Sequence, residues 1–300
     1  MAYFVFDLDE TLGNFYTPYY FLEDLRNTKP EAYKNFVEAV AAVEDSGHPL
    51  GIIRPGILDV MRILKQLKDR GAVKSLVIYS NNSYLAALEF ARDVIQQVVD
   101  DSSLFSDCIH WGREGRMAEH TGREGSANKT WAVLTNLMIN GPTAATELTP
   151  EKVYFFDDQE HILEKELPAG HTVRMMEYPF KASATRVGHI YKDAVIAAFK
   201  EDDVGLSDFV DTLKTNDSDK YTFMTPTRAL EAHTQFLISR TRGTVNRIAQ
   251  VPGPDASIVA SMTLLRNFEQ EHQKGGNQKK WRGTVRRKDR RKRRHGSRRR

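Results

Sequence analysis

The chain has 300 residues, of which 40% are hydrophobic and 28% are charged. These fractions are typical of a soluble globular protein with a sizeable core, and they exclude a disordered or membrane chain. Apolar runs fall short of the roughly 18 residues that span a bilayer, and acidic residues interrupt the N-terminal apolar run by position 7, so we expect neither a membrane span nor a secretory signal. The single cysteine, Cys108, excludes an internal disulfide and predicts an intracellular, reducing compartment, with Cys108 itself as a small core residue.

The net charge of +3 hides an uneven distribution. Residues 274–300 contain 15 Lys and Arg and one acid, Asp289, whereas the other 273 residues carry 28 basic and 39 acidic groups. We expect this tail to be disordered when unbound, because it lacks apolar content. Such basic runs bind polyanions, including nucleic acid, and also act as nuclear localisation signals, which predicts a nuclear protein if the source is eukaryotic or infects eukaryotes. A localising tail unrelated to catalysis and a tail that helps to bind substrate both remain open.

Alternating strands and helices follow from the N-terminus. Short apolar runs predict buried parallel strands, and apolar residues at helical spacing predict amphipathic helices, the first two of which have Pro near the start and Gly at the end. The stretch between the third helix and the fourth is interpreted as a loop. The predicted strands are 3–8, 75–80, 152–158 and 171–178, and the predicted helices are 29–47, 54–71, 83–100 and 128–139.

This alternation implies right-handed crossovers and therefore an α/β fold, a Rossmann-like three-layer parallel sheet. We assign it to residues 1–200, with a small cap inserted at about 14–50. The character changes at about 201, where two further helices, 227–242 and 254–273, occur without strands between them. We therefore treat 201–273 as a helical appendage and 274–300 as the disordered basic tail.

Polar groups follow three of the predicted strands directly: Asp7 and Asp9, then Ser80 and Asn81, then Asp157 and Asp158. The carboxyl ends of parallel strands meet at one edge of a sheet, where ligands bind. Two clusters of carboxylates and a hydroxyl at that edge are hard oxygen ligands of the kind that Mg²⁺ prefers. One such cluster alone could equally be a solvated strand end, but three converging strand ends favour a metal site.

These motifs resemble those of the haloacid-dehalogenase-like (HAD) phosphohydrolase superfamily. Its motif DxDx[TV] stands here as "DLDET", residues 7–11, and its Ser or Thr after an apolar strand as Ser80 in "LVIYS". Its Lys at a helix start matches Lys129 in "ANKTW", and its acidic pair matches "FFDD", Asp157 and Asp158. All four occur in the family's order within residues 1–200.

Two stretches, "FDLDETL" and "RPGILDVMRILKQL", make the chain look closest to the branch that contains the RNA polymerase II C-terminal-domain phosphatases and their small relatives. Two motifs depart from that branch. It commonly has Asp-Asn where this chain has Asp157-Asp158, and its second motif is usually Thr-Ala-Ser-like, where this chain has "SNNS".

The resemblance implies a Mg²⁺-dependent phosphatase. Asp7 would attack phosphorus and form an aspartyl-phosphate, and Asp9 would protonate the leaving oxygen and then deprotonate water. Mg²⁺ would be held by Asp7, by the Asp9 carbonyl and by Asp157. Asp158 would be either a direct ligand or a residue that contacts a ligand without touching the metal. Ser80 would hold phosphoryl oxygens, and Lys129 would balance the charge.

Other residues are weaker candidates for contacting the substrate. Thr11 could bind it or only stabilise the loop after the strand, and Asn81 accompanies Ser80. Three arginines, Arg113, Arg116 and Arg123, lie with His120 in a glycine-rich loop that could bind a second phosphate or be merely solvated. The nine histidines show no spacing typical of a zinc site.

The resemblance thus implies a phosphomonoesterase. A phosphoprotein is the first candidate substrate and a nucleic-acid end the second, because in this superfamily a small cap implies an open site that a macromolecule can reach. A phosphatase for small metabolites with a localising tail is the alternative. A third is a non-catalytic nucleic-acid-binding or scaffold protein on the same fold. No membrane partner is expected.

Overall fold

The structure is a computed structural model, and it describes residues 1–13, 15, 22, 25–26, 29–45, 52–110, 129–176, 192–199, 203–214, 228, 230–232 and 255–272. The basic tail and the arginine-containing loop 111–128 lie outside the described residues, as does 233–254. Among the described residues, no helix is both long and apolar enough to cross a lipid bilayer.

A five-stranded sheet, parallel throughout, forms the centre of the molecule, with strand order β3-β2-β1-β4-β5. This confirms the expected α/β class with a Rossmann-like parallel sheet. The strands are β1 (Ala2–Phe6), β2 (Val73–Tyr79), β3 (Phe105–Ile109), β4 (Val153–Asp157) and β5 (Thr172–Arg174).

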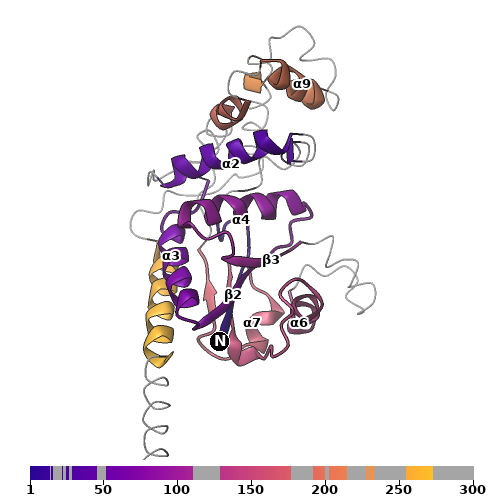
Figure 1. Ribbon diagram of the computed structural model, residues 1–300. Coiled ribbons are helices and arrows are strands. Elements are labelled where there is room, and N and C mark those ends of the chain that lie inside the picture. The colour runs from indigo at the N-terminus through magenta and orange to yellow at the C-terminus, as the bar shows by residue number, and fades with distance from the viewer. Residues whose placement is uncertain are drawn as a thin grey trace, which may run out of the picture.

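Helices cover both faces of the sheet, as Figure 1 shows. Side chains of successive β1 residues alternate between two hydrophobic clusters, Phe4 and Phe6 in one and Tyr3 and Val5 in the other. The helices of the first face are α3 (Ile57–Asp69), α4 (Leu85–Val99) and the helix at 256–272, and those of the second are α6 (Trp131–Asn140) and α7 (Ile162–Glu166).

An outer group of helices lies on α4 (Figure 1). It begins with α2 (Pro30–Asp45), which is the main described part of the expected cap. The Tyr33 hydroxyl of α2 donates a hydrogen bond to Asp93 of α4 at 2.9 Å, and the Phe36 and Phe90 rings lie 5.4 Å apart. A short helix at 192–199 and α9 (Asp203–Lys214) continue this group.

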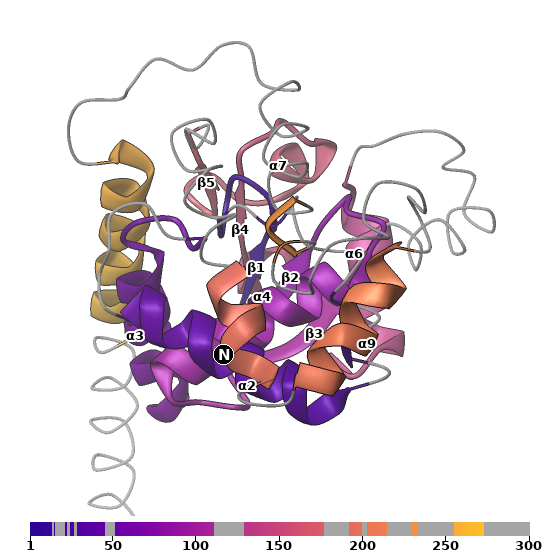
Figure 2. The same cartoon turned by 90° about the horizontal axis from the view of Figure 1, so that it is seen from above.

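Stacked aromatic rings tie β1 to β4. The register pairs Phe4 with Tyr154 and Phe6 with Phe156, and the ring centroids of these pairs are 4.9 and 4.5 Å apart. Phe268, on the helix at 256–272, meets Phe4 and Tyr154 edge-on. This helix, yellow beside α3 in Figure 2, is therefore packed on the sheet, although it falls within the expected appendage.

The structure differs from the sequence expectation at β3, which lies in the stretch interpreted as a loop. Phe105, Cys108 and Ile109 are buried there, but Ser106 and Asp107 interrupt the apolar run that would have indicated a strand. Cys108 is buried, as predicted. α7 was also missed, since five residues are too few to show helical periodicity. Of the expected helix 227–242, residues 228 and 230–232 are helical and the rest lies outside the described residues.

Candidate active site

The order of the strands reverses direction at β1. From β1 the chain proceeds outward through β2 to β3, and it then returns to the other side of β1 to add β4 and β5. In open parallel sheets, ligands bind in the crevice at the carboxyl ends of the strands where the order reverses. Here that place lies between the ends of β1 and β4, which carry Asp7 and Asp157.

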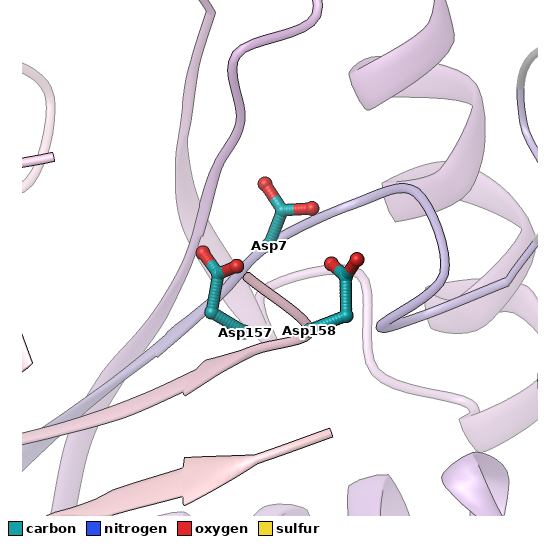
Figure 3. Close-up of side chains that lie close together, drawn as sticks. All are labelled: Asp7, Asp157 and Asp158. Atoms are coloured by element: carbon teal, nitrogen blue, oxygen red, sulfur yellow. The ribbon is translucent and has the colours of Figure 1, made fainter. Parts of the chain in front are cut away.

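Three carboxylates converge at this edge. Asp7 follows β1, Asp157 ends β4, and Asp158 comes next in the chain; an oxygen atom of each lies within 4.8 Å of the others. Figure 3 shows the three carboxyl groups on the same side of the strand ends. Asp7 and Asp157 are buried, and Asp158 is partly exposed.

A buried lysine bridges two of these carboxylates. Lys129 precedes α6, and its Nζ lies 2.5 Å from Asp7 Oδ1 and 2.6 Å from Asp157 Oδ2. Its side chain is 1% exposed, so its charge must be met within the protein. Burial lowers the pKa of Lys129, but Asp7 and Asp157 raise it more, and the ammonium stays charged.

His161 contacts both Lys129 and Asp157. The backbone N–H of Lys129 donates to His161 Nδ1 at 3.2 Å, so Nδ1 is the acceptor and Nε2 carries the proton. Nε2 lies 3.4 Å from Asp157 Oδ2. His161 therefore links the backbone of Lys129 to the carboxylate that Lys129 neutralises.

Asp9, in the turn after β1, is held by two donors. The backbone N–H of Phe15 donates to Oδ1 at 3.2 Å, and the Asn82 amide donates to Oδ2 at 3.1 Å. Burial raises the pKa of Asp9 to about 7 against the effect of these two donors. Asp9 is thus oriented by its neighbours and is able to exchange a proton near neutral pH.

The loop between β2 and α4 forms the opposite wall. Ser80 is buried, and its Oγ accepts the Asn82 N–H at 3.2 Å. Together with Asp7, Asp9, Lys129 and the β4 end, this loop lines a cavity of about 280 Å³. The described lining residues are Asp7, Asp9, Ser80, Asn81, Asn82, Ser83, Tyr84, Lys129, Asp157, Asp158, Gln159 and His161.

Most of the predicted site residues lie around this cavity. The exception among those described is Thr11, whose hydroxyl donates to Asp158 Oδ1 at 3.4 Å without lining the cavity. Arg113, Arg116 and Arg123 lie outside the described residues. Sequence reasoning missed Asn82 and His161. Both are close in sequence to predicted site residues, Asn82 two residues after Ser80 and His161 four residues after Asp157, but they lie in loops, where no periodicity predicts which way a side chain faces.

The donor set fits a divalent cation. Asp7, Asp9, Asp157 and Asp158 line the cavity, and among the described lining residues Lys129 is the one Lys or Arg that opposes them. Burial raises the pKa of Asp7 to about 8 even beside Lys129, with Asp157 contributing in the same direction; burial and Asp157 also raise the pKa of Asp158. Asp157 behaves oppositely, because Lys129 and His161 outweigh the effect of burial and lower its pKa. The raised pKa values of Asp7 and Asp158 mean that Lys129 does not fully compensate the negative charge of these two carboxylates. A divalent cation could supply the missing positive charge, and carboxylate oxygens are ligands of the kind that Mg²⁺ prefers.

Comparisons with models of protein families, with curated proteins and with solved structures found no match.

Proposed function

We propose that this protein is a Mg²⁺-dependent phosphomonoesterase of the HAD-like type. The observation that carries the proposal is the position of Asp7, which lies at the end of β1 in contact with Lys129 and close to Asp157 and Asp158. With a divalent cation bound beside it, the Asp7 carboxylate would be ionised and would act as a nucleophile lining the cavity, with the candidate acid–base residue Asp9 two residues further along the chain.

In the first half of the proposed reaction, an Asp7 oxygen attacks phosphorus and the bond to the leaving oxygen breaks, which leaves an aspartyl-phosphate. Asp9 gives its proton to the leaving oxygen. In the second half, Asp9 takes a proton from water as the water oxygen attacks phosphorus, and phosphate and free Asp7 result.

The remaining residues neutralise and orient. Lys129 offsets the negative charge that Asp7 and the phosphoryl group bring together, and Ser80 lies where its hydroxyl could contact a phosphoryl oxygen. A divalent cation held by Asp7, Asp157 and Asp158 would draw nucleophile and phosphate together by neutralising both.

The cavity bears on the substrate. Its volume of about 280 Å³ lies below the roughly 300–1,000 Å³ of sites that enclose whole small molecules. A phosphoryl group and the atoms next to it fit, and the remainder of a larger substrate would lie outside. We therefore keep the substrate class expected from the sequence, a phosphorylated macromolecule, with a phosphoprotein ahead of a nucleic-acid end.

A phosphate-release panel tests the proposal. Phosphopeptides, 3′- and 5′-phosphorylated oligonucleotides and small phosphate esters are incubated with the full chain, with Mg²⁺ or with a chelator. We expect turnover that requires Mg²⁺ and is abolished by Asp7→Asn, because an amide does not attack phosphorus. The matched control is Asp59→Asn, which changes an exposed aspartate paired with Arg62 on α3.

Each outcome of the panel is decisive. Turnover of more than a few per cent by folded Asp7→Asn, or full activity in the chelator, would overturn the mechanism. Preference for small esters would favour a metabolite phosphatase. No turnover of any substrate would favour the non-catalytic alternative.

A further inference from the structure

Arg54, just before α3, is a buried cation away from the cavity. Its side chain is 1% exposed, although arginine is among the residues least often fully buried. A buried guanidinium has to be matched by acceptors, because burying an unpaired charge is costly. The identity of those acceptors shows what the residue holds in place.

The guanidinium contacts three segments that are distant in sequence. Nε donates to Asp255 Oδ2 at 2.7 Å, and Nη2 donates to the Met176 carbonyl, after β5, at 2.5 Å. Nη1 donates to the carbonyl of Glu10. Arg54 thus joins the turn after β1, the end of β5 and the start of the helix at 256–272.

The turn at Glu10 carries Asp9 and is held by its backbone. Glu10 has a φ of 64°, in the left-handed region that non-glycine residues rarely adopt. The Glu10 N–H donates to the Gly13 carbonyl at 2.8 Å, and the Arg54 N–H donates to the Leu12 carbonyl, also at 2.8 Å. Arg54 therefore holds this turn with both its backbone and its side chain.

The approach of Gly13 to Ile52 is too close for a side chain. A Cβ atom at Gly13 would lie 2.2 Å from the Ile52 carbonyl oxygen. The turn after β1 is consequently packed directly on the segment that leads into Arg54. A shift of Arg54 would therefore displace this turn and, with it, Asp9.

Asp255 holds the start of the last described helix against the same place. Its Oδ1 accepts the Ser257 N–H at 2.9 Å, and Ser257 Oγ accepts the Met176 N–H at 2.6 Å. At Gly56, a Cβ would lie 2.8 Å from Ile258, so this end of the helix is tightly docked beside α3. Arg54 lowers the pKa of the Asp255 carboxyl against the effect of burial, so this carboxyl is ionised at neutral pH.

We propose that Arg54 is a positioning residue for Asp9, with Asp255 as its counterion, and that the segment 255–272 is therefore a working part of the catalytic unit. The role assigned to Asp9 rests on the proposed function. The contacts of Arg54 with Glu10 and Asp255 stand apart from it.

The test uses Asp255→Ala in the full chain, with Glu269→Ala as the matched control. Glu269 lies on the same helix and pairs with Arg70 before β2, so its loss disturbs the docking of the helix at the amino end of the sheet. Asp255→Asn is the conservative variant, because its amide oxygen can still accept from Arg54 or from Ser257.

Turnover is measured on an alkyl phosphate and on an activated aryl phosphate. A positioned general acid contributes about 10²–10⁴-fold, and an alkyl leaving group needs its proton most. We expect Asp255→Ala to lower kcat on the alkyl ester at least about tenfold more than on the aryl ester, as a fraction of that contribution. KM should change little, Asp255→Asn should recover part of the loss, and Glu269→Ala should keep the wild-type ratio.

Hydrogen exchange provides a second measurement that does not depend on activity. The amides of Glu10, Leu12 and Gly13 are hydrogen-bonded within the turn and should exchange slowly. Asp255→Ala should speed their exchange at least about tenfold, because a segment opens more often when the interactions that hold it are weakened. Glu269→Ala should leave their exchange unchanged.

Unchanged exchange in this turn, or equal losses on both esters, would overturn the positioning role. If the wild-type chain hydrolyses no ester, the proposed function fails. The exchange result then decides separately whether Arg54 and Asp255 hold the turn.

Discussion

Replacing Lys129 by methionine removes the positive charge between Asp7 and Asp157 and leaves a side chain of similar length. Both carboxylates stay buried, and the ion pairs at 2.5 and 2.6 Å disappear. Removal of one partner from a buried ion pair typically destabilises a protein by about 3–5 kcal/mol. Without Lys129, Asp7 can bind a proton and so avoid being a buried unpaired charge, because its pKa already lies at about 8. The destabilisation therefore comes mainly from Asp157, which is left as a buried unpaired charge. We expect the free energy of unfolding to fall by about 3–5 kcal/mol at pH 8.

The assay is urea unfolding followed by circular dichroism at pH 8 and pH 5. The pKa of Asp157 is held low by Lys129 and should rise once the lysine is gone. As the pH falls, Asp157 of the variant then takes up a proton in the folded state, so the difference from wild type should shrink towards pH 5. Mg²⁺ at about 100 times its dissociation constant should restore about 2.7 kcal/mol if the carboxylates bind it.

Lys152→Met is the control. Lys152 is 35% exposed and pairs with an exposed Glu147 at 3.2 Å, so its loss should change stability by less than about 1 kcal/mol. A folded Lys129→Met variant as stable as wild type at pH 8, or a loss of the same size at both pH values, would refute the reasoning.

Two further predictions concern the core and the tail. Burial raises the pKa of Cys108 from 9.0 to about 12, so between these pH values the thiol stays neutral in the folded state while it ionises in the unfolded chain. The free energy of unfolding of the wild type should therefore fall with pH between pH 9 and 12, by up to about 1.4 kcal/mol per pH unit more than that of Cys108→Ala. Urea unfolding of both proteins over this pH range measures the two slopes. Parallel slopes would contradict this. Deleting residues 274–300 removes a net charge of +14. The deletion should abolish salt-sensitive binding to duplex DNA and leave kcat on an aryl phosphate unchanged. For the full chain, the logarithm of the binding constant should fall with the logarithm of the salt concentration with a slope of about −0.9 per neutralised phosphate. Equal binding without the tail would refute the electrostatic argument.

How far the sequence predicts the fold depends on whether the signal is local. β1 and the first four residues of β4 are continuous apolar runs, β2 ends in one at 76–79, and α3 shows its buried residues at helical spacing, so these elements could be predicted. β3 could not, since Ser106 and Asp107 break its run and its burial depends on pairing with β2. The helix at 256–272 could be predicted as a helix, but its position on the sheet depends on contacts such as that of Phe268 with Phe4.

The same distinction applies to the site. The meeting of Asp7, Asp157 and Asp158 follows from the parallel arrangement of β1 and β4, which the alternation of strands and helices indicates. The motif predicts the position of Lys129 at a helix start, whereas its two ion pairs depend on how α6 packs. The contacts of His161, Asn82 and Arg54 join segments through loops, and no periodicity reports them.

Among the described residues, the helices on the face of α6 and α7 are shorter than those on the other face, and the carboxylates and the lysine of the site belong to different layers. Lys129 and His161 belong to the layer of α6 and α7, where helices of ten and five residues cover the sheet, while Asp7 and Asp157 are anchored in the central strands. The Leu163 N–H donates to the Lys129 carbonyl at 2.9 Å, so these two segments are joined to one another. We expect this thin layer to open as one unit in native-state hydrogen exchange, before the strands do. Each opening would carry the Lys129 ammonium away from the Asp7 and Asp157 carboxylates, which stay in place. A cation bound by these carboxylates would prolong the open state, in which Lys129 no longer neutralises them.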